Sequence, residues 1–156
     1  MPFDKGIYYL LVALAFGITA LALIPKRQYK KFFIYGLLFG GILDMFIIII
    51  FSGFFHLFKY FYIGSFSILG LFSFWTPIAW IFTFMIYLYF LPVRKIFLYP
   101  YVASFIAFGY MVGQAFQGIG LFKFYNGYLY FMPFTFVMWF SIAAWAFIKG
   151  EKIILR

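Results

Sequence analysis

The sequence predicts an all-α bundle of five transmembrane helices, and three observations carry that prediction. Of 156 residues, 68% are hydrophobic and only 10% are charged, whereas soluble domains carry charge on about a quarter of their residues. The apolar residues form runs of about 20, the length that crosses a hydrocarbon core of about 30 Å. The charges lie almost entirely between these runs. We therefore expect residues 1–156 to form one transmembrane domain.

The first predicted span covers residues 6–24, and Pro25 ends it. The alternative is a cleaved signal peptide, because the Ala-Leu-Ala sequence at residues 20–22 resembles a cleavage site. However, four positive charges follow directly in the loop at 26–31, and they oppose translocation of that loop. We favour a retained helix.

The second predicted span, residues 32–55, carries a single charge at its centre, Asp44. Gly36, Gly40 and Asp44 recur every four residues and so share one helix face. A charge at the bilayer centre costs about 2.5–3.5 kcal/mol on insertion scales, and it therefore usually faces the bundle interior and often marks function. Two interpretations stay open: Asp44 belongs to a binding or transport site, or it is a hydrogen-bonded acid that joins two helices.

The third predicted span lies at about residues 66–91, in a charge-free stretch that is too long for one helix. Thr76 and Pro77 resemble an N-cap followed by proline at the first helical position. A helix from there to Pro92 would be about 22 Å long, shorter than the hydrocarbon core of about 30 Å. We predict a kink or interruption near Pro77. The alternative is a re-entrant segment over residues 64–75, and such segments often line sites.

The fourth and fifth spans are expected at about residues 98–122 and 128–148. The turn between them, at 123–127, contains Asn-Gly, a strong turn signal. Two pairs of glycines four residues apart fit close helix packing, within the chain or between chains. These packing glycines are Gly36, Gly40, Gly109 and Gly113.

The positive charges predict the orientation in the membrane. With five spans, nine Lys and Arg residues lie on the side of the C-terminus and three on the other side. The nine are Lys26, Arg27, Lys30, Lys31, Arg94, Lys95, Lys149, Lys152 and Arg156, and the three are Lys5, Lys59 and Lys123. The positive-inside rule then places the N-terminus outside and the C-terminus in the cytoplasm. We expect a prokaryotic plasma membrane, with anionic lipids against the basic cytoplasmic face.

A candidate ligand pocket follows from depth in the membrane. Counting equal distances from the cytoplasmic ends places Trp80, Tyr110 and about Thr135 at the level of Asp44. Gln114 lies one turn further out than Tyr110, and Gln117 about another turn. The predicted ligand-binding residues are Asp44, Trp80, Tyr110, Gln114 and Gln117.

Composition limits the chemistry. The chain has no Cys and one His, His56, which excludes thiol catalysis, a zinc site and a bis-histidine haem built from this chain alone. His56 fits an interfacial position, as do many of the 14 Tyr residues. No nucleotide-binding or catalytic motif is present, so an enzyme is not favoured, no metal is expected and no cofactor is assigned. A flat apolar ligand such as a quinone or carotenoid along the Phe rings is a minor alternative.

Two functional classes remain. The first is a module that binds or transports a small apolar or amphipathic ligand in a pocket around Asp44. The second is a non-catalytic structural or accessory subunit of a homo-oligomer or a larger membrane complex. Nucleic acid is not expected as a partner, because lipid headgroups explain the basic loops.

Overall fold

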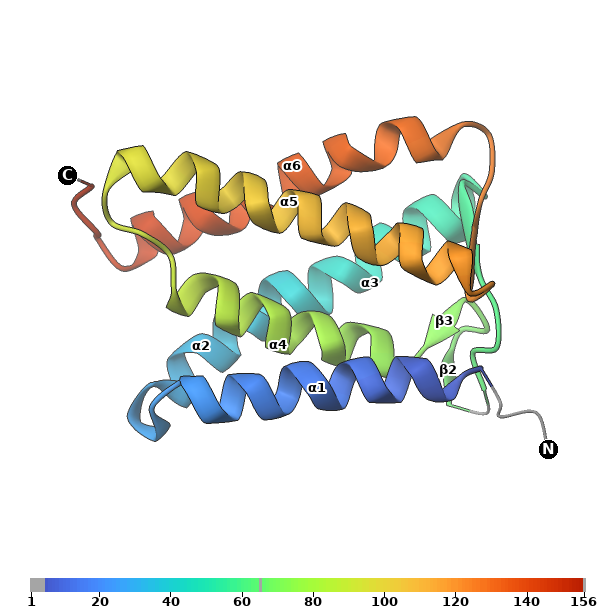
Figure 1. The fold of residues 1–156 in the computed structure, drawn as a ribbon, viewed down its shortest axis with the longest axis horizontal. Coiled ribbons are helices and arrows are strands. Elements are labelled where there is room, and N and C mark those ends of the chain that lie inside the picture. The colour runs from blue at the N-terminus through green and yellow to red at the C-terminus, as the bar shows by residue number, and fades with distance from the viewer. Residues whose placement is uncertain (1–4, 65, 156) are drawn as a thin grey trace.

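The computed structural model describes residues 5–64 and 66–155, and it is mostly helical. The helices form five rods, which lie roughly side by side in Figure 1. The rods are α1 (Ile7–Leu23), a long second rod, α4 (Trp75–Tyr89), α5 (Lys95–Gly118) and α6 (Tyr128–Gly150). The second rod consists of the 3-10 turn η1 (Lys26–Gln28), α2 (Tyr29–Gly36), η2 (Leu37–Ile42), α3 (Leu43–Ile48) and η3 (Ile49–Phe54). The predicted helical class agrees with this content.

Three of the five rods are long and apolar enough to cross a membrane. They are Lys26–Phe54 with 29 residues, α5 with 24 and α6 with 23. The other two, α1 with 17 residues and α4 with 15, are apolar but shorter. At 1.5 Å per residue they reach about 25 Å and 22 Å.

The chain is interrupted just before Pro77, and the structure differs in detail from a kinked helix over residues 66–91. Helix α4 begins at Trp75, so Pro77 lies in its first turn, where proline is tolerated because the first amides of a helix lack intrahelical partners. The N-cap is Phe74 rather than Thr76, and the Trp75 amide donates to the Ser73 hydroxyl at 3.4 Å.

Short strands, which the sequence did not predict, occupy the region before α4 and the turn before α6. Strand β1 (Phe58–Tyr60) pairs antiparallel with β4 (Phe122–Phe124), and β2 (Ser67–Ile68) pairs with β3 (Phe72–Ser73). The β1–β4 register places Lys59 opposite Lys123, both exposed. Alternate residues on the other face, including Phe58 and Phe122, are buried, so the ladder covers this end of the bundle.

The second rod alternates between α-helix and the wider π-helix. Every fourth residue along it is buried, namely Phe32, Gly36, Gly40, Asp44, Ile48 and Ser52. An α-helix turns by about 100° per residue, so a four-residue repeat would drift by about 40° per step. The two π-helical segments, η2 and η3, have i→i+5 hydrogen bonds and more residues per turn. They offset the drift and keep the repeat on one face.

Small residues join α1, the second rod and α4 into one layer. A Cβ added at Gly36 would lie 2.6 Å from the Ile81 carbonyl oxygen, and one at Gly40 would overlap the Trp80 backbone. Ala13, Gly17 and Ala20 are the buried small residues of α1; α1 makes its main helix contacts with α4. The backbones of this layer therefore approach closely.

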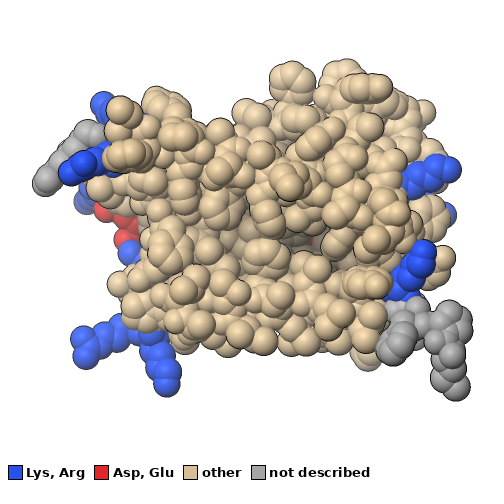
Figure 2. Space-filling model, in the orientation of Figure 1, with Lys and Arg blue, Asp and Glu red and all other residues tan. Residues whose placement is uncertain are grey.

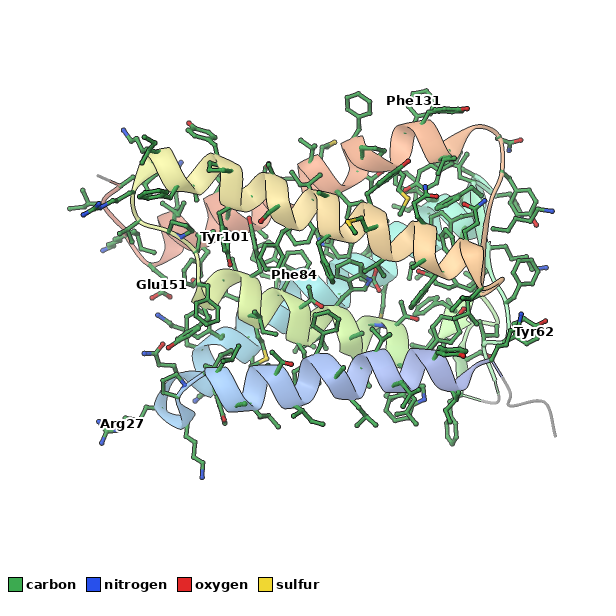
Figure 3. All side chains as sticks on the ribbon, in the orientation of Figure 1. Arg27, Tyr62, Phe84, Tyr101, Phe131 and Glu151 are labelled. Carbon is green, nitrogen blue, oxygen red and sulfur yellow. The ribbon has the colours of Figure 1, made fainter. Side chains whose placement is uncertain are left out.

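Helices α5 and α6 form a hairpin that aromatic rings separate from this layer. Phe84 of α4 stacks on Phe140 of α6 at a centroid distance of 4.9 Å, and Tyr87 stacks on Tyr101 of α5 at 5.6 Å. In Figure 3 the labelled Phe84 and Tyr101 lie between the ribbons of the two groups of helices. The Tyr87 hydroxyl donates to the Phe140 carbonyl at 3.0 Å.

Apart from Asp44, the charged side chains of the described residues lie at the two ends of the bundle. Figure 2 shows the blue Lys and Arg side chains at both ends and a tan band between them. At the end that holds the C-terminus, the Lys31 ammonium pairs with the Glu151 carboxylate at 3.0 Å, and the Tyr35 hydroxyl lies 3.2 Å from Glu151. Arg156, counted above with the basic side, lies outside the described residues.

Candidate functional site

A cavity of about 80 Å³ lies between the two groups of helices, towards the end covered by strands β1 and β4. Its walls come from α3, α4, α5, α6 and the two strands. The polar residues among its lining are Asp44, Tyr60, Thr76, Trp80, Tyr128, Thr135 and Trp139. The remaining lining is apolar, and it includes Gly109 and Gly113 of α5.

Asp44 is buried in the wall of this cavity, with 3% of its surface exposed. It lies in the short helix α3 between the two π-helical segments. Such segments occur often at functional sites. Its Oδ2 has no hydrogen-bond partner among the residues that the structure describes. An unpaired polar atom in an apolar interior costs about 1–3 kcal/mol, so the fold retains an acid with one oxygen that the described residues leave unsatisfied.

Thr76 presents a second unsatisfied atom to the same cavity. Its Oγ1 is buried and, within residues 5–64 and 66–155, has no hydrogen-bond partner. The residue lies in the first turn of α4, which begins where the β2–β3 hairpin ends. Asp44 and Thr76 are the two residues of the described chain with such atoms, and both line one cavity.

Aromatic rings form two walls of the cavity. One wall comes from α4 and α6, where Trp80 lies 4.9 Å from Trp139 and 5.9 Å from Phe136, measured between ring centroids. The other wall comes from the strands and the start of α6. Its rings are Phe58, Tyr60, Phe122 and Tyr128, with neighbouring centroids 4.8–5.9 Å apart.

Tyr60 is a ring of the strand wall, and Asp44 affects the pKa of its hydroxyl. It lies in β1, outside the helices. Burial first, and then the Asp44 carboxylate, raise the pKa of the Tyr60 hydroxyl well above its ordinary value. The phenol therefore stays protonated and offers a neutral O–H group to the cavity.

Trp139 fixes the position of the aromatic wall relative to the Asp44 rod. Its Nε1–H donates to the Phe39 carbonyl at 2.7 Å, in a buried hydrogen bond between α6 and η2. This bond ties α6 to the π-helical segment that precedes Asp44. The position of the indole is thus set by the same irregular segment that positions the acid.

A second, smaller cavity of about 30 Å³ adjoins the first. The two share Thr76, Trp80, Val112 and Phe116 as lining residues. Tyr9, Val12 and Phe16 of α1 complete the second cavity together with residues of α4 and α5. Figure 2 shows a hollow in this face of the molecule, between α5 and α1. The site therefore extends sideways from Asp44 towards the flank of the bundle.

The structure brings together some of the predicted site residues. Asp44 and Trp80 line the cavity, and Thr135, expected at the same depth, lines it too. Its hydroxyl lies 3.1 Å from the Tyr128 hydroxyl. Gly36 and Gly40 lie on the stripe that carries Asp44 and contact α4. A Cβ at Gly109 would meet the Phe136 ring, and one at Gly113 would meet Met132, so all four glycines face other helices of the same chain.

Tyr110, Gln114 and Gln117 are not among the residues that line the cavity. The lining positions of α5 are Gly109, Val112, Gly113 and Phe116, a spacing that follows one helix face. The three predicted residues lie one position further along the chain and so point about 100° away from that face. Depth in the membrane gives the height of a residue along its helix and carries no information on this rotation.

Sequence reasoning missed Thr76, Tyr60, Tyr128 and Trp139 as lining residues. Tyrosine near the end of a span is typical of the membrane interface, and threonine before proline is typical of a helix cap, so neither pattern predicts a cavity wall. His56 is exposed, and its Nδ1 lies 3.1 Å from the Phe54 carbonyl oxygen. No group of three or more metal-ligating side chains occurs among the described residues.

Fold and site together define a helical chain with three helices capable of spanning a membrane and a buried acid in an interhelical cavity. The chain matches no protein-family model, and it has no significant similarity to curated proteins or to solved structures.

Proposed function

We propose that this protein binds or transports a small apolar or amphipathic ligand in the cavity around Asp44. One observation carries the proposal: a buried carboxylate oxygen without a partner lines a cavity that also presents the unpaired Thr76 hydroxyl. A bound polar group would satisfy both atoms and remove their desolvation cost. The aromatic walls would hold the apolar part of the ligand.

The cavity has room for more than solvent. A water molecule needs about 10–15 Å³ measured in this way, and the main cavity offers about 80 Å³. Waters could pair with the polar atoms of the lining, but only a ligand with an apolar part would also contact the aromatic rings. Intramembrane carboxylates commonly mark ligand or ion pathways, which agrees with this interpretation.

The proposal assumes five spans, an outside N-terminus and a cytoplasmic C-terminus in a prokaryotic plasma membrane. The separation of charges to the two ends supports the spans, and the larger basic group supports the orientation. Anionic lipids would neutralise that basic end. Single cysteines at Gln28 and Asn126 should react with a membrane-impermeant reagent from opposite sides. Labelling from one side would contradict the five-span arrangement.

Native mass spectrometry of the purified protein tests the binding proposal directly. The wild-type chain should retain a small non-lipid mass, and Asp44→Asn should lose it while remaining folded, because the amide keeps the shape and removes the charge. Glu151→Gln is the matched control, since it removes an acid at the end of the bundle, outside the cavity. Retention of the ligand by Asp44→Asn would exclude a role for the carboxylate.

A structural or accessory role is the second candidate, and the exposure of α5 favours it. All of α5 is described, and Gly109 is its one buried residue. A second copy or a larger complex would cover this helix. The same native mass measurement would then show a fixed stoichiometry in place of a bound small molecule.

A further inference from the structure

We infer that the ligand of the Asp44 cavity is a small alkylammonium ion, a protonated amine with short alkyl substituents. This inference rests on the proposed function and names the chemical class of its ligand. The Asp44 carboxylate supplies the opposite charge, and the aromatic walls supply ring faces for the cation.

The cavity contains no basic side chain. No Lys, Arg or His appears among its lining residues, and the described Lys and Arg residues lie at or beyond the ends of the helical rods. A buried carboxylate requires either a proton or a cation close by. The described chain provides no cation at the cavity, so Asp44 can carry its charge there only beside a ligand that supplies the positive partner.

The rings give this cation a second attraction. The face of an aromatic ring carries partial negative charge, and cations bind within about 6 Å of the centroid, most strongly over Trp. Two tryptophans, Trp80 and Trp139, line one wall, and four further rings line the other. Proteins bind methylated ammonium groups, such as methyl-lysine, in cages of aromatic rings.

The polar atoms suit an ammonium group better than a metal ion. Metal cations such as Ca²⁺ take about six to eight oxygen ligands, whereas this cavity has one carboxylate and scattered hydroxyls. A protonated amine has few N–H donors. The unpaired Asp44 Oδ2 and Thr76 Oγ1 are both able to accept from them.

The volume limits the size of the ion. A cavity of about 150 Å³ accommodates benzene, and the main cavity here measures about 80 Å³. An ammonium group with one to three methyl substituents matches this space. The adjoining cavity of about 30 Å³ would accept a short extension of one substituent towards α1.

Calorimetric titration of the full chain in lipid nanodiscs tests the inference. The probes are trimethylammonium, the neutral molecule tert-butanol, which has a similar shape, and tetrabutylammonium, which exceeds the cavity. We expect trimethylammonium to bind at least tenfold more tightly than tert-butanol, and tetrabutylammonium not to bind. Asp44→Asn should weaken trimethylammonium binding at least tenfold and change tert-butanol binding less than twofold. Glu151→Gln should leave both within twofold.

The outcomes separate this inference from the proposed function. Equal affinity for trimethylammonium and tert-butanol in the wild-type protein would overturn the ammonium assignment and leave the ligand-binding proposal standing. This comparison needs no variant, so it remains decisive where Asp44→Asn fails to fold. Absence of binding by all three probes, together with absence of a co-purifying small molecule, would overturn both.

Discussion

The layer formed by α1, the second rod and α4 differs from the α5–α6 hairpin in how its helices meet. In the layer, Gly36 and Gly40 bring two backbones into direct contact. Across the boundary with the hairpin, the rings of Phe84, Tyr87 and Phe140 keep the backbones apart. The cavity lies at this boundary and not within the layer.

This difference shows where a membrane protein can keep a binding space. Helices in lipid associate through packing and hydrogen bonds, because lipid tails are as apolar as the side chains they would replace. Contacts between backbones leave no volume for a ligand. Rigid rings of different size and tilt leave gaps between them. At one end of the boundary such a gap is lined by Asp44, the only acid within the described helices.

The largest loss of stability is expected when a single methyl group is added between the helices of the layer. A Cβ at Gly40 would overlap the Trp80 carbonyl group, and a backbone cannot rotate away as a flexible side chain can. We expect Gly40→Ala to lower the free energy of unfolding by about 3 kcal/mol, measured by denaturant titration in micelles.

Gly118→Ala is the matched control for that substitution. It adds the same methyl group at a helical position where no atom lies within 4 Å of the added Cβ. Because alanine favours helix over glycine by up to about 1 kcal/mol, this variant should be as stable as the wild type or slightly more stable. Equal destabilisation by both variants would contradict the claim that close backbone contact in the layer makes Gly40 sensitive to substitution.

A smaller effect is expected from removing a whole ring at the boundary. Phe140 is fully buried and contacts Phe84, Tyr87 and Trp80. The cost of a large-to-small substitution has two parts, the lost free energy of transfer from water and the cost of the cavity left behind. In lipid the transfer part largely disappears, so we expect the cavity part alone, about 2 kcal/mol. We expect Phe140→Ala to be less destabilising than Gly40→Ala in the same titration. A larger loss would show that the rings, and not the glycines, dominate stability.

The smallest effect is expected from one hydrogen bond across the boundary. Trp139→Phe keeps an aromatic ring and removes the donor to the Phe39 carbonyl. Interhelical hydrogen bonds in membranes average about 0.6 kcal/mol and reach about 1.7, so we expect a loss of about 1 kcal/mol. Trp145→Phe is the control, because Trp145 is exposed. Identical unfolding curves for the two variants would show that the bond contributes nothing.

The helical class was predictable because composition and run length depend on sequence alone. The glycine stripe with Asp44 was predictable for the same reason, since a four-residue spacing is visible in the chain. The rotation of α5, which turns Gln114 away from the cavity, was not predictable, because nothing in the sequence of α5 shows which of its faces meets α6. The strand pairing of residues 58–60 with 122–124 depends on segments distant in sequence.

The alternation of helix types in the second rod has a consequence for insertions and deletions. The four-residue repeat stays on one face because η2 and η3 each provide wider turns. Deleting one residue from η2 would let the wider turn close to an α-helical turn, which absorbs the loss. Gly36 and Asp44 would then be seven residues apart, and seven residues at about 100° each complete about two turns, so Asp44, Ile48 and Ser52 would stay on the buried face. A one-residue insertion has no wider turn to absorb it and would rotate the segment beyond it by about 100°.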